Sequence, residues 1–234
     1  MGSDISHNQA AGGSSAGQSV KKGLILDVDG TLWDALEAIT DSWNQYTDPL
    51  EDVDRRITYE QMAGCLGKTM FTIADILFGY LPTERRREVL RGAMKYENEY
   101  LWTHPGKVYP GVKDTLEQLR AEGWHLYSVS NCQKGYIETF LHAADADGLI
   151  EDHICFEDTM QEKAENIRLC SARNRLDRAF YVGDTEGDLE ASLNAGVPFI
   201  FAGYGFGSVD ERDADGVIGQ FAQLKDVLAQ CDRG

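Results

Sequence analysis

Four aspartates, in two pairs, are the residues of this sequence best suited to chemistry, because each pair follows a short apolar segment. Asp27 and Asp29 lie two positions apart in Asp-Val-Asp-Gly-Thr, and Asp184 and Asp188 lie four apart in Asp-Thr-Glu-Gly-Asp. Four carboxylates brought together are costly without a cation between them, since like charges at short range disfavour ionisation. Carboxylate oxygens suit a hard ion such as Mg²⁺. The two pairs therefore predict a magnesium site.

Three other polar residues could bind a phosphate beside that site. Ser130 and Asn131 come at the end of another apolar segment, and Lys163 stands at the start of a helical one. With a metal and Lys163 in place, the pocket would attract a phosphate monoester. The Ser130 hydroxyl, Lys163 and backbone amides around Gly30 can bind its equatorial oxygens.

The spacing of the first pair suggests two roles for its carboxylates. An ionised carboxylate can attack phosphorus and form an aspartyl-phosphate. A second carboxylate two residues on can protonate the leaving oxygen and later deprotonate the attacking water. Each motif alone has an ordinary structural interpretation: an Asp-Gly turn, a helix N-cap, a solvated lysine, or an acidic first helical turn. Their order, each after a strand or at a helix start, favours a shared site.

Short apolar runs bounded by turn residues supply the elements that must position these side chains. Such runs indicate strands buried on both faces, as in a parallel sheet, and helical patterns with apolar faces alternate with them. The alternation predicts an α/β fold with a doubly wound parallel sheet and helices on both sides. Ligands of such sheets bind beyond the carboxyl ends of the strands. The predicted strands are Lys22–Asp29, Trp124–Ser130, Ala179–Gly183 and Val197–Ala202, and the helical faces include Val112/Leu116/Leu119, Tyr136/Ile137/Phe140/Leu141 and Phe221/Leu224/Val227/Leu228.

One region interrupts the alternation and indicates a second unit. Residues 35–106 are rich in Glu, Arg, Gln, Met and Leu, with few convincing strands, so we expect an inserted α-helical cap. The core is then assigned to residues 21–34 and 107–234. Residues 1–20 are rich in Gly, Ser, Ala, Asn and Gln without the apolar stretch of a secretory signal, and are expected to form a flexible tail.

Composition argues against several classes of partner. Asp and Glu outnumber Lys and Arg by 39 to 22, a net charge of -17, which repels nucleic acid and anionic membranes. No stretch approaches the roughly 20 apolar residues that span a bilayer. The five cysteines form no Cys-x-x-Cys pair, which argues against a zinc or dithiol site and for reduced thiols. We expect a cytoplasmic protein that acts on a small phosphorylated metabolite.

Three further features of the sequence have both a functional and a structural interpretation. Gly67-Lys68-Thr69 resembles the end of a P-loop, but Met62 occupies the position of the required earlier glycine. Lys68 is then either a substrate contact from the cap or an exposed lysine. Residues 203–207 are glycine-rich without a following helix, which favours a loop near the pocket rim over a dinucleotide site. Trp33 is a cap hinge, a substrate wall or ordinary packing.

Together the four motifs resemble the signature motifs of the haloacid dehalogenase superfamily. The resemblance runs from Lys21 onward and is to the phosphatase branch with a helical cap after the first motif, phosphoglycolate phosphatase-like members being the nearest match. It implies a Rossmann-like core and bound Mg²⁺. Lys163 is followed here by Ala164, where the family often has proline.

The resemblance also implies a role for each residue. Asp27 would be the nucleophile and a magnesium ligand, and Asp29 the general acid/base with its backbone carbonyl on the metal. Asp184 would be a further metal ligand, supported or joined by Asp188. The transferring phosphoryl group would be bound by Ser130, Asn131 and Lys163.

Two alternatives stay open on sequence alone, and a third is disfavoured. A phosphomutase of the β-phosphoglucomutase type would use the same core with a different cap, and a phosphate-binding regulatory module would use it without turnover. A dehalogenase is disfavoured, because Asp29 would have no obvious use as a proton donor. The sequence specifies neither the substrate nor the oligomeric state.

Overall fold

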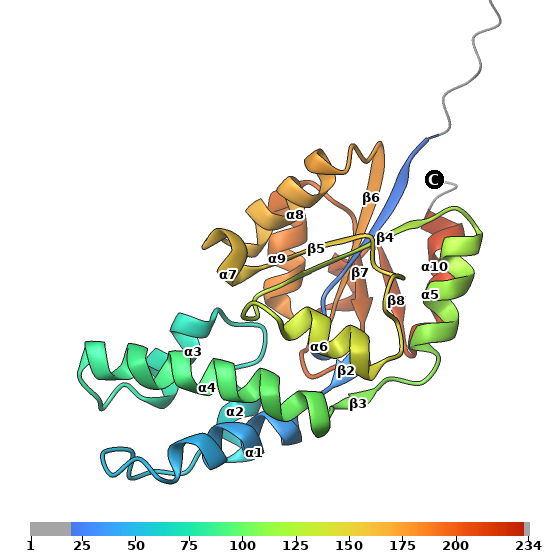
Figure 1. Cartoon of the computed structure of the whole chain (residues 1–234). Coiled ribbons are helices and arrows are strands. Elements are labelled where there is room, and N and C mark those ends of the chain that lie inside the picture. The colour runs from blue at the N-terminus through green and yellow to red at the C-terminus, as the bar shows by residue number, and fades with distance from the viewer. Residues whose placement is uncertain (1–19, 232–234) are drawn as a thin grey trace, which may run out of the picture.

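The computed structural model describes residues 20–231, so the predicted tail, residues 1–20, lies outside the described residues apart from Val20. A six-stranded parallel sheet of order β5-β4-β1-β6-β7-β8 forms the centre of the molecule (Figure 1). β1 lies in the middle, and the chain builds outward from it first to one side and then to the other. The strands are β1 (Lys22–Leu26), β4 (His125–Ser130), β5 (Asp152–Cys155), β6 (Arg178–Gly183), β7 (Phe199–Ala202) and β8 (Gly216–Ile218).

Helices cover both faces of this sheet, which confirms the predicted doubly wound α/β core. Leu24 and Leu26 of β1 are buried in one hydrophobic cluster and Ile25 in the other, so the central strand is apolar without alternation. The first cluster includes side chains of α5 (Val112–Ala121), α6 (Tyr136–Ala143) and α10 (Leu224–Cys231). The second includes those of α8 (Lys163–Arg173) and α9 (Glu186–Ala195). Shorter helices are α7 (Phe156–Thr159), η1 (Glu211–Asp213) and η2 (Phe221–Gln223).

The two outer strands of the sheet are the elements that the apolar runs do not predict. β5 and β8 lie at opposite edges, and each is only partly buried. An edge strand needs no continuous apolar run, because one side of it has no neighbouring strand. The four predicted strands are confirmed, with β1 ending at Leu26 and leaving Asp27 to Asp29 in the following turn.

A helical lobe, residues 35–106, is inserted between two short antiparallel strands, β2 (Trp33–Asp34) and β3 (Lys107–Val108). Its helices lie to one side of the sheet (Figure 1). Among the described residues, no helix is both long and apolar enough to cross a bilayer. The lobe helices are α1 (Leu36–Thr47), α2 (Tyr59–Ala63), α3 (Met70–Leu77) and α4 (Thr83–Thr103).

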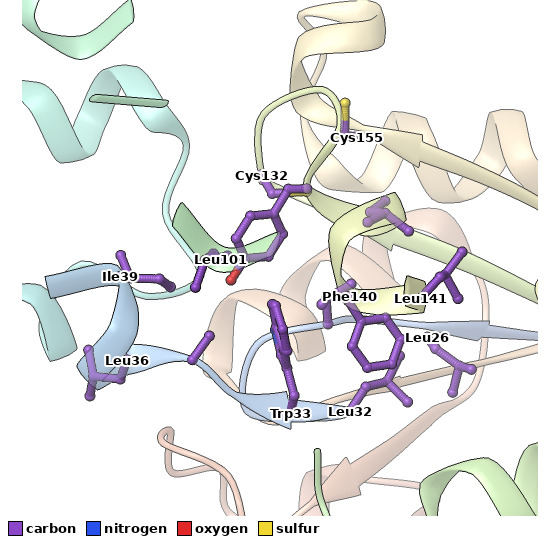
Figure 2. Packing of buried hydrophobic residues seen from close by; sticks show 14 of the residues in the cluster. Leu26, Leu32, Trp33, Leu36, Ile39, Leu101, Cys132, Phe140, Leu141 and Cys155 are labelled. Atoms are coloured by element: carbon purple, nitrogen blue, oxygen red, sulfur yellow. The ribbon is translucent and has the colours of Figure 1, made fainter. Parts of the chain in front are cut away.

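Trp33 anchors the start of this insertion to the core. It is fully buried, and its ring meets Phe140 of α6 edge-on, with centroids 5.4 Å apart (Figure 2). Tyr136 of the same helix also meets it edge-on, with centroids 5.6 Å apart. Such edge-to-face pairs add to the stability gained from burial alone. Packing therefore accounts for Trp33, although its indole nitrogen has a further contact described below.

The burial of β1 predicts a large stability difference between two isoleucines. Ile25→Ala leaves a cavity in a fully buried site and should lower the free energy of unfolding by about 2–5 kcal/mol. Ile76→Ala, in α3 with 52% of the side chain exposed, should change it by less than about 0.5 kcal/mol. Urea unfolding followed by circular dichroism measures both. Equal losses in the two variants would contradict the burial of β1.

Candidate active site

Three neighbouring strands end at the residues singled out in the sequence. Asp27 directly follows β1, Ser130 ends β4 and Asp184 directly follows β6. Because β1 pairs with both β4 and β6, in parallel, their carboxyl ends lie at one edge of the sheet. This edge is where the chain reverses its direction of winding, the usual place for a ligand in such sheets.

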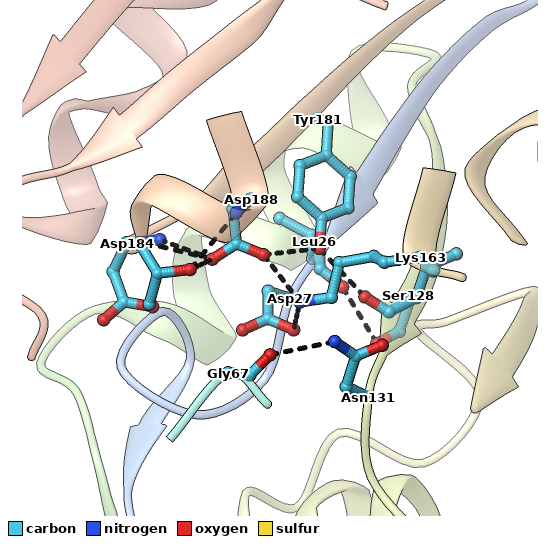
Figure 3. A network of polar contacts seen from close by, with 11 residues as sticks. Leu26, Asp27, Gly67, Ser128, Asn131, Lys163, Tyr181, Asp184 and Asp188 are labelled. Carbon is cyan, nitrogen blue, oxygen red and sulfur yellow. Dashed lines mark hydrogen bonds and ion pairs between the residues drawn. The ribbon is translucent and has the colours of Figure 1, made fainter. Parts of the chain in front are cut away.

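A buried lysine lies between two of the aspartates. Lys163, the first residue of α8, donates to Asp27 Oδ1 at 3.0 Å and to Asp188 Oδ1 at 2.6 Å (Figure 3). Burial disfavours the charged lysine, but the two carboxylates outweigh it and raise its pKa. Burial raises the pKa of Asp27 to about 6, against the lowering effects of Lys163 and of a hydrogen bond from Ser130. The ammonium is thus charged and shared.

Asp188 is fully occupied by protein donors. Its Oδ1 also accepts from the Tyr181 hydroxyl at 3.2 Å, and its Oδ2 accepts from the Thr185 hydroxyl at 2.7 Å and from two backbone amides. Thr185 and Asp188 form a reciprocal capping box at the start of α9. Burial opposes ionisation of Asp188, but Lys163 and Thr185 outweigh it and lower its pKa. Asp188 therefore fixes the turn that carries Asp184.

Asp184 has an oxygen without a protein partner. Its Oδ2 accepts from the amides of Phe206 and Gly207 at 2.8 and 3.2 Å, so the predicted glycine-rich loop does reach the site. Its Oδ1 is buried and receives no hydrogen bond from the described residues. Burial, then the charges of Asp188 and Asp27, raise the pKa of Asp184 to about 8.

These carboxylates fit a hard divalent cation. Oxygens of Asp27, Asp184 and Asp188 lie within 4.8 Å of one another, with Lys163 as the counter-charge that contacts Asp27 and Asp188. A cation would compensate the remaining charge and give Asp184 Oδ1 a partner. Gly30 lets the backbone approach this carboxylate: a Cβ there would lie 2.1 Å from Asp184 Oδ2.

The side chain of Asp29 points to a different environment. Its Oδ1 accepts from the Tyr136 hydroxyl at 2.6 Å and from Trp33 Nε1 at 3.0 Å. Burial raises the pKa of Asp29 to about 7, and the Tyr136 hydrogen bond only partly offsets this. The cluster around Asp184 does not include the Asp29 carboxylate. A contribution of Asp29 to a metal through its backbone carbonyl stays a prediction.

Asn131 connects the core to the lobe. Its Nδ2 donates to the carbonyl of Gly67 at 2.8 Å, between α2 and α3, while its Oδ1 is buried and accepts from none of the described residues. The adjacent Lys68 is exposed but lines a cavity between the sheet edge and the lobe, as does Asn131. Gly67 follows a helical segment and not a strand, which agrees with the rejection of a P-loop. Phosphate binding by Asn131 stays a prediction.

A small cavity of about 40 Å³ lies between the sheet edge and the lobe, and several of its polar residues, Glu97 and Tyr136 among them, were not predicted from the sequence as site residues. Glu97 of α4 lines it together with Asp27, Asp29 and Ser130. Glu97 is only 3% exposed and takes the i+4 position between the buried Ala93 and Leu101. The sequence does contain a signal for Glu97, because an acidic residue stands there among the apolar residues on one face of the helix.

The pKa of Asp184 predicts how its replacement affects the metal-free protein. Because the folded-state pKa of about 8 exceeds the ordinary 3.8, stability is lost as pH rises between these values. Asp184→Asn removes that loss. We compare the melting temperature of the variant with that of wild type in the presence of a chelator. The difference, variant minus wild type, should be about 5 °C larger at pH 8 than at pH 5.5, which corresponds to about 1–2 kcal/mol of unfolding free energy. Asp147→Asn, at an exposed position, should show no such pH-dependent gain. A constant difference for Asp184→Asn would contradict the interpretation.

Comparisons with known proteins agree with the fold and the motifs. The family model for haloacid dehalogenase-like hydrolases matches residues 24–202. A phosphoglycolate phosphatase from Nitrosospira multiformis is 27% identical over 208 residues, 84% of this chain and 91% of that protein. Another from Cereibacter sphaeroides is 26% identical over 213 residues, 88% and 97% of the two chains. A crystal structure from Haemophilus somnus, described as a predicted phosphoglycolate phosphatase, superimposes with a TM-score of 0.78 at 21% identity. The superposition covers 88% of this chain and 97% of that chain. As its motifs predict, the chain belongs to the haloacid dehalogenase-like hydrolase family.

Proposed function

We propose that the protein is a magnesium-dependent phosphatase that hydrolyses a small phosphate monoester through an aspartyl-phosphate on Asp27. The observation that carries the proposal is the buried Asp27 carboxylate, 3.0 Å from Lys163 and clustered with Asp184, whose Oδ1 accepts no hydrogen bond from residues 20–231. The relatives named phosphoglycolate phosphatase support the reaction class.

Asp27 attacks the phosphorus atom, and the bond between phosphorus and the ester oxygen breaks as Asp29 gives that oxygen a proton. Asp29 then takes a proton from water, which attacks the aspartyl-phosphate, releases inorganic phosphate and restores Asp27. Lys163 and Ser130, both next to Asp27, hold the phosphoryl oxygens. When bound by Asp27, Asp184 and the Asp29 carbonyl, Mg²⁺ supplies charge neutralisation for the phosphoryl group.

The surroundings of Asp29 suit a general acid/base. A pKa near 7 means that the carboxyl is partly protonated at neutral pH and can act in both directions. Tyr136 and Trp33 both donate to Oδ1, which leaves Oδ2 as the oxygen that carries the transferring proton. Tyr136 and Trp33 are therefore positioning residues for Asp29.

The helical lobe, residues 35–106, is proposed to be a cap over the core formed by residues 21–34 and 107–234. It contributes Trp43, Lys68 and Glu97 to the wall of the cavity. Hydrogen bonds from Asn131 to Gly67 and from Gln133 to Glu97 join the core to this lobe. A closed cap would exclude bulk water from the aspartyl-phosphate until the leaving group departs.

Replacement of the nucleophile tests the reaction. Asp27→Asn should lower kcat for p-nitrophenyl phosphate with Mg²⁺ by about 10⁴-fold or more, because the amide cannot form the phosphoenzyme. Circular dichroism should show an unchanged fold. A chelator should abolish the wild-type activity, and added Mg²⁺ should restore it. Near wild-type turnover by Asp27→Asn would refute the mechanism, and phosphate binding without any turnover would favour a regulatory module.

The role of Tyr136 predicts a dependence on the leaving group. Tyr136→Phe removes one hydrogen bond to Asp29 and should lower kcat/KM for an alkyl phosphate by about tenfold. It should change kcat/KM for p-nitrophenyl phosphate by less than about twofold, since kcat/KM reports formation of the aspartyl-phosphate and p-nitrophenolate needs no proton to leave. Tyr127→Phe, whose hydroxyl contacts Glu151 far from the site, is the matched control. An equal loss on both substrates would indicate a purely structural role for Tyr136.

A further inference from the structure

Glu97 is a buried carboxylate that the proposed mechanism does not use. It projects from α4 of the lobe and lines the same cavity as Asp27 and Asp29. Two donors hold it: Trp43 Nε1 donates to Oε2, and Gln133 Nε2 donates to Oε1 at 3.1 Å. Each carboxylate oxygen has a second lone pair, so Glu97 keeps acceptor capacity beyond these two bonds.

The charge of Glu97 has no counter-charge in contact with it. Both donors are neutral, and the ion pairs described for residues 20–231 include none with Glu97. Burial raises its pKa to about 7, so the carboxyl is partly protonated at neutral pH until a cation pairs with it. A carboxylate buried among neutral groups is costly, and an apolar side chain would continue the stripe of Ala93 and Leu101 at no such cost. Packing alone therefore does not explain an acid at this position.

The rest of the cavity wall restricts what could pair with Glu97. Apolar side chains form much of it, among them Ile39, Met62 and Ile73. Lys68 is the basic lining residue on the lobe side, and it is exposed, whereas Lys163 at the sheet edge is already shared by Asp27 and Asp188. An anionic leaving group would meet Glu97 and Asp29, while a cationic one would give Glu97 the charged partner that residues 20–231 do not supply.

We propose that Glu97 selects the substrate, and that the leaving group is a small amino alcohol whose ammonium group binds the Glu97 carboxylate. This inference rests on the proposed phosphatase activity. Glu97 lines the same cavity as Asp27 and Asp29, so a leaving group protonated by Asp29 lies in the cavity that Glu97 faces. The ammonium donates to the free lone pairs of Glu97, and the apolar walls contact the short carbon chain. Glycolate, which carries a carboxylate, is the wrong charge for this position.

Three phosphates of similar size and different charge test the inference. With Mg²⁺, wild-type kcat/KM should be highest for phosphoethanolamine, lower for ethyl phosphate and lowest for phosphoglycolate. Glu97→Gln should lower kcat/KM for phosphoethanolamine by about 10- to 100-fold, the range for one charge-assisted hydrogen bond. The same substitution should change kcat/KM for ethyl phosphate by less than about threefold and should raise kcat/KM for phosphoglycolate. Glu99→Gln, an exposed glutamate of the same helix, should leave all three values unchanged.

The controls separate this inference from the proposed function. If wild type hydrolyses p-nitrophenyl phosphate but prefers phosphoglycolate, the role of Glu97 is refuted while the phosphatase mechanism stands. If neither p-nitrophenyl phosphate nor any of the three small phosphates is hydrolysed, both fail. Should Glu97→Gln not fold, the wild-type order of the three substrates still decides. Product inhibition gives a second measure: ethanolamine should inhibit wild type more strongly than ethanol does, and equal inhibition would count against an ammonium site.

Discussion

The shared ion pair of Lys163 with Asp27 and Asp188 is the interaction on which the rest of the site depends. All three side chains are at most 6% exposed, so none of the charges is neutralised by solvent. Removing the ammonium would leave two buried carboxylates facing each other, which costs several kcal/mol in typical proteins. The pair also joins the end of β1 to the start of α8 and the first turn of α9. The active geometry and the packing of three elements are therefore stabilised by the same contacts.

One lysine cannot balance the carboxylates around it, and this imbalance explains the architecture near Asp184. Asp188 accepts the shorter of the two hydrogen bonds from Lys163, and it also accepts from the hydroxyls of Thr185 and Tyr181. Asp184 is left with two backbone amides on Oδ2, and within the described part of the chain no group donates to its Oδ1. Gly30, at φ +79°, allows the first motif to approach that carboxylate. The Asp-Gly pair is a turn, as its composition suggests, but the glycine is also required by close approach to Asp184.

The sequence is most informative where one physical demand dominates. β1 is buried on both faces, so its apolar run is unmistakable, and the polar residues after β1, β4 and β6 follow from where parallel strands end. β5 and β8 escape prediction because an edge strand carries no such run. The partners of Asn131 and Asp29 also escape it, since contacts with Gly67 and Tyr136 join residues 64 and 107 positions apart in the chain. Such contacts depend on tertiary packing, which one sequence does not specify.

Glu97 shows why the chemistry is easier to infer than the substrate. The residues proposed to cleave the ester lie at strand ends or helix starts, where backbone geometry fixes their positions. The residues that would contact the leaving group come from a lobe of helices, where any side chain on an inward face can reach the cavity. Most of those positions are apolar, and an apolar wall discriminates weakly between small substrates. A single buried charge among them discriminates far more strongly, because its unpaired state is costly. Selectivity in this protein thus depends less on the shape of the lobe than on the charge of one side chain within it.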